Sequence, residues 1–403
     1  MPTANTYVRS ACVASQSADG RRRASSGFRL GHVLLLTIGA YLCFGLRLFA
    51  QTSDSRTAEE PTKSWTATTD STNDNLKPTR TTETHLQNGN RTLDERSVQI
   101  PGSGGHFEPY QDIEKETLQV DATTVRSTTR TFARDVNGMK ALVQVTEEEK
   151  HTLPGGDSNV ISITSSPDVN GNLQPVEREI AETKRISTDV DETKTTVMHP
   201  SVNGGLAPVL KTDEFRRRVA NDTAESQTTT LLPDGAGNWQ VSEVRQATTR
   251  REGTNRTTEE RVSRLDSEGK LGEVSHVVSQ EAESTSGEKR SVVETYSIDV
   301  PGTTPDGSLH LVERKTSTES STSTGERATE QKVEQTNPGD PGSGLRVSVL
   351  VDGRMLPGPS GEQSTVTIRA RDVNGSFGIV SVDTTKADRV PTIQVQQTPA
   401  EKP

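Results

Sequence analysis

Glycines that stand two positions before a bulky apolar residue recur along most of this chain. Their spacing is about 33 residues from Gly105 to Gly269 and becomes looser after that. A second set of turn signals, such as PGGD (154–157) and EGTN (252–255), falls about halfway between these glycines. The repeat therefore has two arms and two turns, and any fold of the chain has to accommodate it. With Gly138 included, the series is Gly105, Gly138, Gly171, Gly204, Gly237, Gly269, Gly307 and Gly375.

The arms of the repeat favour strands over helices. Segments such as VEREIAETKRIST (176–188) and STVTIRARD (364–372) are rich in Thr, Val, Ser and Arg, and several arms alternate with period two. Thr and Val fit a pleated strand better than a helix, and the apolar residues do not recur with helical spacing. A period near 33 also suits ankyrin or other helical repeats. The best helix candidate, VTEEEKHTL (145–153), still ranks below a strand.

Paired arms joined by glycine turns predict an all-β fold. Some nine repeats would supply on the order of 18 strands, each roughly 35–40 Å long, and an open sheet of that size curls or splits. We expect an elongated antiparallel β-meander of about 33-residue hairpin repeats, in which each repeat contacts mainly its neighbours. Its thin core would come from Leu173, Val176, Trp239, Val241, Leu271, Val274, Leu309 and Leu311.

An outer-membrane barrel is not expected from the same sequence. Such a barrel needs apolar, lipid-facing residues at alternate positions and aromatic girdles at both interfaces. Stretches such as ETKTTVMH (192–199) and ERKTSTESSTSTGE (313–326) offer polar residues on both faces of a strand. The sequence therefore argues for an open meander.

The first fifty residues have the features of a secretory signal. Arg21, Arg22, Arg23 and Arg29 precede the apolar run VLLLTIGAYLCFGL (33–46), and the best cleavage position is after Ala50. An uncleaved anchor is the alternative, although the run is shorter than the roughly 20 residues of a membrane helix. We divide the chain into a targeting segment (1–50), a polar linker (51–75), the β-hairpin repeat region (76–385) and a disordered tail (386–403).

Composition limits the kind of protein that this chain can be. Hydrophobic residues make up 29%, aromatic residues 3% and charged residues 25% of the sequence, and disorder is common in that range. Both cysteines, Cys12 and Cys43, lie in the targeting segment, so a chain cleaved after Ala50 has no thiol for disulfides, zinc or catalysis. The formal net charge of −10 argues against nucleic acid as a partner.

The pentapeptide RDVNG occurs at 134–138 and 371–375, with the related PDVNG at 167–171. Asp and Asn offer oxygen ligands for calcium, but a calcium loop needs further ligands at fixed offsets. Asn-Gly is also a strong hairpin signal, because both residues tolerate positive φ. Tight turns are the preferred interpretation, and weak calcium binding is the alternative.

No catalytic, cofactor or metal site is predicted. The histidines outside the targeting segment are scattered, without the spacing of a metal site: His85, His106, His151, His199, His276 and His310. Acidic pairs such as Glu147-Glu148 fit a solvated face better than a glycosidase dyad. Trp239 and Tyr296 could stack on a sugar but fit better among the few core aromatics. The sequence lacks a nucleophile elbow, a P-loop and a dinucleotide-binding motif.

The runs LLPDGAGNWQVSEVR (231–245), NRTTEERVSRLDSEGKL (255–271) and VETYSIDVPGTTPDGSLHL (293–311) resemble uncharacterised exported repeat proteins of acidobacteria. This resemblance extends over most of the chain after about residue 80. It implies a bacterial, exported protein built from β-repeats. No activity is established for that group, so no catalytic or binding residue carries over.

We therefore predict an exported, non-enzymatic structural or protein-interaction repeat protein of the cell envelope or extracellular space. A secreted carbohydrate-binding or surface-adhesion module is the alternative, and a glycan-directed hydrolase is third. The expected partner is an envelope protein or a polysaccharide, with no nucleic acid. Contact with a membrane is expected only through the N-terminal segment, if it is not cleaved.

Overall fold

The computed structural model describes residues 63–73, 78–102, 106–134, 138–266, 268–303, 307–358, 361–372 and 374–388. The chain divides into two units, 1–59 and 60–403, and all described residues belong to the second. The predicted targeting segment and most of the predicted tail lie outside the described residues. Among those described, no helix is long and apolar enough to cross a membrane.

The second unit consists of antiparallel strands, so the prediction of an all-β antiparallel meander is confirmed. The strands are β1 (Lys63–Asn73), β2 (Thr79–Asn88), β3 (Arg91–Pro101), β4 (Phe107–Gln119), β5 (Thr124–Arg134), β6 (Lys140–Thr152), β7 (Ser158–Pro167), β8 (Leu173–Ser187), β9 (Val190–Pro200), β10 (Leu206–Ala220), β11 (Thr223–Pro233), β12 (Trp239–Glu252), β13 (Asn255–Leu265), β14 (Leu271–Glu283), β15 (Lys289–Ser297), β16 (His310–Ser321), β17 (Arg327–Thr336), β18 (Leu345–Gly358), β19 (Gly361–Arg371) and β20 (Phe377–Asp388). One short 3₁₀ turn, η2 (Pro341–Ser343), precedes β18.

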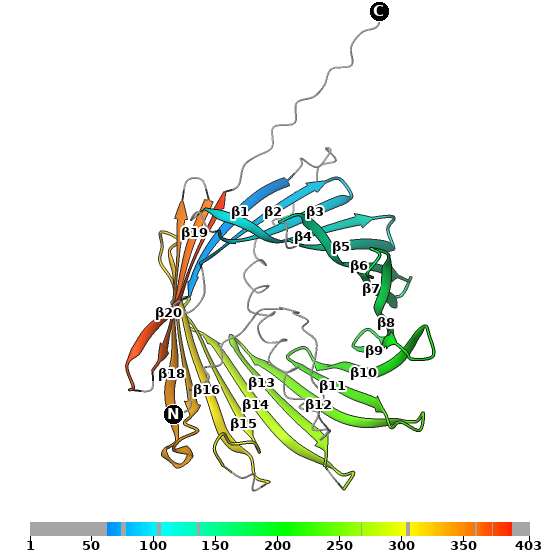
Figure 1. Ribbon diagram of the computed structural model, residues 1–403. Helices are drawn as coiled ribbons and strands as arrows, with labels where there is room; N and C mark the ends of the chain where they lie inside the picture. The colour runs from blue at the N-terminus through cyan, green and yellow to red at the C-terminus, as the bar shows by residue number, and fades with distance from the viewer. Residues whose placement is uncertain are drawn as a thin grey trace, which may run out of the picture. The chain divides into compact units, whose positions relative to one another are not determined.

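The strands close into a barrel. Each strand pairs with its neighbours in sequence, and β20 pairs with β1 over eight residues on each strand, from Thr66–Asp388 to Asn73–Ser381. At this seam the hydroxyl oxygens of Thr69 and Thr385 lie 2.9 Å apart. Figure 1 shows the strands following one another around a ring until β20 returns to β1. The expectation of an elongated, open meander is therefore wrong.

Closure has a physical cause that the repeat alone does not reveal. A long antiparallel sheet twists, and an open one keeps two edge strands with unpaired N–H and C=O groups. Pairing β1 with β20 satisfies both edges at once. The argument that a sheet of this size curls or splits was sound, but the sheet curls onto itself rather than into an open superhelix.

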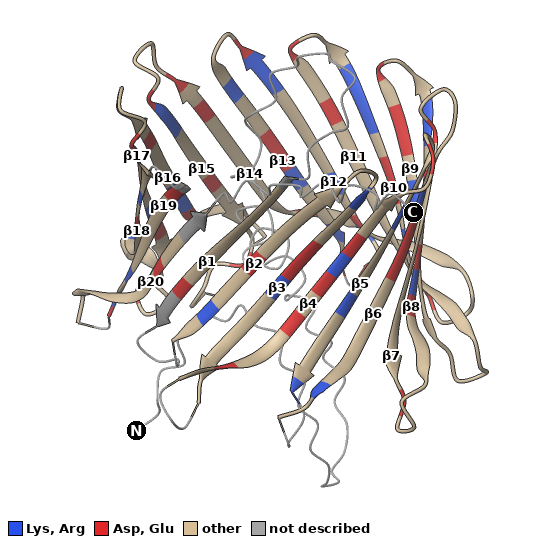
Figure 2. Ribbon diagram, turned by 90° about the horizontal axis from the view of Figure 1, so that it is seen from above, with Lys and Arg blue, Asp and Glu red and all other residues tan. Residues whose placement is uncertain are grey.

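The register divides the side chains of the wall between two faces. Residues directly opposite each other share a face, and successive residues alternate. On β12 and β13 the pairs Glu243–Arg264 and Arg245–Val262 belong to the inner face, while Val244–Ser263 belongs to the outer face. Lys, Arg, Asp and Glu are distributed over strands all around the wall (Figure 2).

The wall has almost no packed core. The buried apolar residues in the described part of the chain are Ala67, Val145, Val262 and Val333. Most of the residues that we predicted as core are partly exposed, and Leu173 and Leu271 retain 45% and 48% of their surface. A closed single-layer wall has no second layer to cover its apolar residues, so the prediction of a thin core was wrong. Ladder hydrogen bonds and cross-strand pairs, worth ~0.2–1 kcal/mol each, carry much of the stability instead.

The strands also extend beyond the boundaries that we predicted for the repeat region. β1 occupies residues 63–73, inside the segment predicted as a polar linker. Its sequence, KSWTATTDSTN, is polar, but its alternating Thr and Ser residues suit a strand with solvent on both faces. β20 likewise runs past residue 385, to Asp388.

Candidate functional site

The segment PDVNG (167–171) forms a tight turn, whereas the Asp-Val-Asn of RDVNG at 134–138 lies outside the described residues. After β7, the carboxylate oxygen Oδ1 of Asp168 accepts the backbone N–H groups of Asn170 and Asn172 at 2.8 and 2.9 Å, and Gly171 has φ 82°. These hydrogen bonds to the ionised carboxylate lower the pKa of Asp168. Asp234, Asp266 and Asp372 accept the corresponding pair of N–H groups in their own turns. The Asp oxygen is therefore used inside the turn, as the preferred interpretation required.

The histidines of the described strands lie apart from one another, and two of them pair with a carboxylate on a neighbouring strand. His85 Nδ1 lies 2.6 Å from Asp94 Oδ1, and its ring stacks on Trp65. His199 Nε2 lies 3.1 Å from Glu177 Oε2. In the described part of the chain, no three His, Cys, Asp or Glu residues are grouped as metal ligands.

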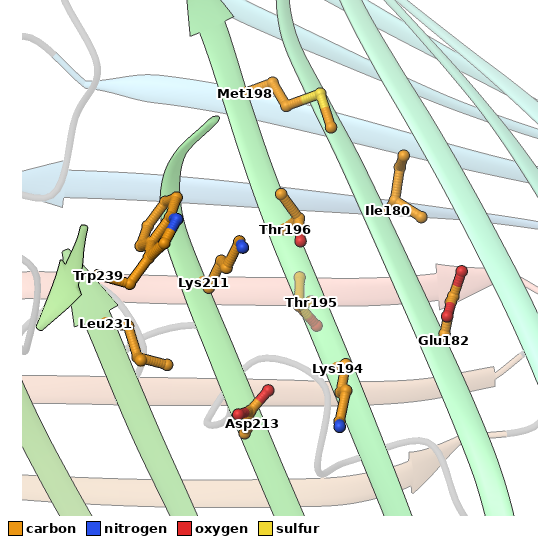
Figure 3. Close-up of a pocket in the computed structure, with 10 residues that line it drawn as sticks. All are labelled: Ile180, Glu182, Lys194, Thr195, Thr196, Met198, Lys211, Asp213, Leu231 and Trp239. Carbon is orange, nitrogen blue, oxygen red and sulfur yellow. The ribbon is translucent and has the colours of Figure 1, made fainter. Parts of the chain in front are cut away.

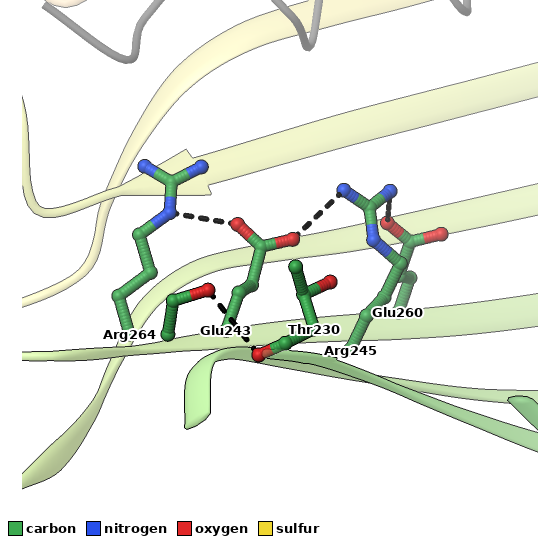
Figure 4. Close-up of polar contacts among 6 residues, drawn as sticks. Thr230, Glu243, Arg245, Glu260 and Arg264 are labelled. Carbon is green, nitrogen blue, oxygen red and sulfur yellow. Dashed lines mark hydrogen bonds and ion pairs between the residues drawn. The ribbon is translucent and has the colours of Figure 1, made fainter. Parts of the chain in front are cut away.

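The inner face carries a network of ion pairs on β12 and β13. Glu243 accepts hydrogen bonds from Arg264 Nε at 2.8 Å and from Arg245 at 3.4 Å, and Arg245 reaches Glu260 at 2.8 Å (Figure 4). These four side chains retain 21–40% of their surface. Because solvent screens such pairs, each contributes only about 0–1 kcal/mol. The interior that they face is therefore open to solvent and is not a packed core.

This network was missed from the sequence. Glu243, Arg245, Glu260 and Arg264 lie about two residues apart within each arm, so period-two alternation could have placed each pair on one face. What the sequence could not supply was the register between β12 and β13, which brings Glu243 opposite Arg264. Without that register, the four charges look like an ordinary solvated face.

The outer face carries a shallow cavity of about 490 Å³ over β8–β12. Ile180, Met198 and Leu231 form its apolar part, and Lys211 places its ammonium 4.4 Å from the ring centre of Trp239 (Figure 3). Trp239 therefore lies at the surface beside a cation and not in a core. This cavity is open and mixed in polarity, so it has the character of a surface depression.

No protein-family model and no curated protein sequence matches the chain. Among solved structures, it is similar to OccK5 (OpdH) of Pseudomonas aeruginosa, with a TM-score of 0.42, 9% identity and coverage of 82% of this chain and 99% of that one. The FrpB iron transporter of Neisseria meningitidis gives a TM-score of 0.43 at 8% identity, with 81% of each chain covered. The copper transporter OprC gives a TM-score of 0.37 at 9% identity, with 84% of this chain and 73% of that chain covered.

The closed wall overturns the functions predicted from the sequence. The structural or protein-interaction repeat protein relied on a long, open β surface, whereas the carbohydrate-binding or adhesion module relied on export and a few aromatic residues. The pairing of β1 with β20 removes that surface and leaves a barrel with an inner and an outer face. The absence of enzymatic activity and the envelope protein or polysaccharide partner stay predictions.

Proposed function

We propose that the chain forms a water-filled channel for hydrophilic solutes in the cell envelope. The observation that carries this proposal is the closure of β1 on β20, because it turns the strands into a wall around a lumen. Barrels of about 16–18 strands already enclose an aqueous channel, and this one has 20 strands. The secretory features of residues 1–50 support export to the envelope.

The lining of the lumen supports hydrophilic solutes over apolar ones. Thr residues line the inner face across neighbouring strands, as in Thr129, Thr146 and Thr164, which lie opposite one another across β5, β6 and β7. The Glu243–Arg264 network adds charges of both signs. Water and ions can be exchanged along such a surface without desolvating unpaired charges.

Electrical recording across a planar phospholipid bilayer tests the channel. We expect the purified protein to produce stepwise increases in conductance. Glu243→Lys should shift the preference from cations toward anions, because it replaces the carboxylate shared by Arg245 and Arg264 with a third cation on the inner face. Glu225→Lys is the matched control, since Glu225 pairs with Arg217 at 2.7 Å on the outer face.

Glu243→Gln is a milder version of the same change and should shift selectivity in the same direction by a smaller amount. Wild-type protein that inserts but gives no conductance steps would contradict the channel. So would an equal change in selectivity for Glu243→Lys and Glu225→Lys, because the ions would then not be passing along the inner face.

A further inference from the structure

One arc of the inner face is apolar, in contrast to the Thr-rich lining of β5–β7. Residues directly opposite each other share a face, so the inner face continues from Glu260 on β13 through the pairs Val277–Thr295 and Glu313–Gln335 to β17. On β17, β18 and β19 it carries a group of apolar side chains that we call the lumen strip: Val333, Val349, Val351, Val366 and Ile368. The lining of the lumen therefore differs from one part of the ring to another.

The side chains of the lumen strip are neighbours in the sheet. Val333 lies opposite Val349, and Val351 lies opposite Ile368. Val366 is two residues from Ile368 and therefore on the same face of β19. Val333 is buried at 8% exposure, and the other four are partly exposed. The strip thus offers apolar surface to a solute that enters the lumen.

Gly353 places a residue without a side chain beside the lumen strip. It lies opposite Thr329 on β17 and Val366 on β19, on the inner face. Its φ is not positive, so its backbone conformation does not require glycine. Glycine inside a strand weakens the strand and often marks a place where a ligand comes close to the backbone. Gly353 is therefore suited to let a solute approach the wall next to Val351.

An arginine without an ion-pair partner lies at one end of the lumen strip. Arg327 is exposed on the inner face of β17, opposite Met355 on β18 and Ser321 on β16. Among the described residues, no carboxylate forms an ion pair with Arg327. Glu319, which is diagonal to it on β16, lies opposite Lys289. The guanidinium of Arg327 is therefore available to a carboxylate from solution, which it can bind with two parallel hydrogen bonds.

The distance between Arg327 and the lumen strip limits the size of the solute. Arg327 lies opposite Met355, and Met355 is four residues from Val351 along β18. At about 3.3 Å per residue this separation is about 13 Å. The long side chain of Arg327 can cover part of it. A carboxylate held by Arg327 therefore needs only a short unbranched chain to bring its apolar end to Val351.

The position of the lumen strip also limits what can occupy it. Its side chains face the lumen, so neither a bilayer around the barrel nor a second copy of the chain beside it reaches them. The occupant has to enter the lumen. The apolar side chains favour a solute with an apolar chain, and the unpaired guanidinium favours an anion over a neutral molecule or a cation.

We infer that the lumen strip and Arg327 form a binding site for water-soluble carboxylates with a short unbranched apolar chain. Arg327 binds the carboxylate, and the chain lies along Gly353 toward Val351 and Val366. This inference rests on the proposed function, because the solute reaches the site through the water-filled lumen. It names one class of solute that the channel binds in preference to others.

Isothermal titration calorimetry with sodium hexanoate and sodium acetate at pH 7 tests the site. Full-length protein in phospholipid nanodiscs is titrated, and empty nanodiscs provide the reference. We expect hexanoate to bind about tenfold more tightly than acetate, because its additional methylene groups are partly buried on the strip and each fully buried methylene contributes about fourfold.

Two pairs of matched variants assign the binding to the inner face. Val351→Thr combined with Val366→Thr should lower the hexanoate preference to about threefold or less, since each change adds a hydroxyl group to the strip. Val347→Thr combined with Val382→Thr makes the same change on the outer face of β18 and β20 and should leave the preference unchanged.

The second pair of variants concerns the carboxylate. Arg327→Gln should weaken hexanoate binding about fivefold or more, because it removes the charged donor. Arg354→Gln, on the outer face of β18, is the matched control and should bind hexanoate as the wild type does.

Equal affinities for hexanoate and acetate would overturn the site, and so would equal losses in the inner-face and outer-face variants. Hexanoate binding that appears only when Leu34 and Leu35 are replaced by Asp would assign the lumen strip to the apolar run of the targeting segment, which also overturns the site. Preferential binding of hexanoate by a protein that gives no conductance steps would refute only the channel. Conductance steps without preferential binding would refute only the site.

Discussion

The two rims of the barrel are built from different hairpins. The turns that follow odd-numbered strands lie at one end of the barrel, the Asp-turn rim, and the turns after even-numbered strands form the opposite rim. At the Asp-turn rim, each of the nine strand pairs from β3–β4 to β19–β20 contains a register shift close to its turn. At the opposite rim, most pairs run to the turn in regular register, as Arg251–Arg256 and Glu252–Asn255 do. One extra residue in a strand reverses the face on which all later residues lie. We call the apolar residues that begin these even-numbered strands, such as Leu173, Trp239 and Leu271, the collar. The bulge changes the face of the residues that follow, so an apolar collar residue and a polar stretch of wall can belong to the same strand.

β8 shows how this works along a single strand. Leu173 and Pro175 face outward opposite Pro167 and Ser165, and the next pair in register is Glu177 with Thr164. Val176 is the extra residue, so Glu177 faces the lumen and Arg178 faces outward. The difference between the rims is therefore a difference in strand geometry as well as in composition.

The largest effect that separates the rims should come from two glycines. Gly302, in the turn after β15, has φ 85°, and a Cβ added there would lie 2.1 Å from the carbonyl oxygen of Pro338. Gly253 at the opposite rim has φ 61° with nothing within 4 Å of an added Cβ. Both replacements by Ala incur left-handed strain of about 1–2 kcal/mol, and Gly302→Ala adds about 1–3 kcal/mol of overpacking.

Urea unfolding measures the difference between these glycines. We expect Gly302→Ala to lower the unfolding midpoint by at least twice as much as Gly253→Ala, with a similar dependence on urea concentration. Equal shifts would mean that the loop containing Pro338 moves aside freely. The two long loops of the Asp-turn rim would then not be packed against each other.

A smaller effect should distinguish Asp234 from Ser284, which occupy the same position in similar turns at opposite rims. Asp234 accepts the N–H groups of Ala236 and Asn238 and the amide of Asn238. Ser284 accepts one N–H group, from Glu288 at 3.1 Å. We expect Ser284→Ala to cost about 0.5 kcal/mol and Asp234→Ala to cost more, because an ionised acceptor makes stronger hydrogen bonds.

Thermal unfolding of the two alanine variants, each compared with wild type, measures this contrast. Asp234→Asn serves as the control for charge, since it retains an acceptor oxygen. Its unfolding temperature should lie between those of the wild type and Asp234→Ala. If Asp234→Ala were as stable as Ser284→Ala, the hydrogen bonds of the turn would contribute little. The apolar collar residues would then account for the stability of this end of the hairpin.

The sequence predicted the turns and the strand arms well, because both depend on local chemistry. Asp168 and Gly171 belong in a tight turn whatever surrounds them, and Thr-rich arms favour strands in any sheet. Closure could not be predicted in the same way, since it depends on the pairing of residues as far apart as Thr69 and Thr385. No short stretch of sequence carries that information.

The faces of the strands were harder to predict for a related reason. Leu173, Trp239 and Leu271 were assigned to a core because large apolar residues usually pack inside. The bulges that place them outward interrupt period-two alternation in each even-numbered strand from β4 to β20. Counting alternate residues across a bulge assigns residues of both faces to one face. Without the register, collar residues could therefore not be distinguished from residues that line the lumen.

The smallest effect concerns the opposite rim at low pH. In the turn between β4 and β5, Asp121 Oδ1 accepts the N–H and hydroxyl of Thr123 at 2.7 Å each and the N–H of Thr124 at 2.9 Å. These hydrogen bonds lower the pKa of Asp121 from 3.8 to about 2. A carboxyl whose pKa is lowered by folding stabilises the protein above its unfolded pKa. That stability is lost as the pH falls from about 4 to about 2.

Asp121→Asn should therefore remove part of the acid sensitivity of the barrel. We expect the wild type to lose thermal stability more steeply than the variant as the pH falls from about 4 to about 2, with parallel curves above pH 5. Asp299→Asn, in the turn region after β15, is the control. It should change the pH dependence of the unfolding temperature less than Asp121→Asn does. Parallel curves for wild type and Asp121→Asn throughout the acid range would show that this turn opens before its carboxyl is protonated.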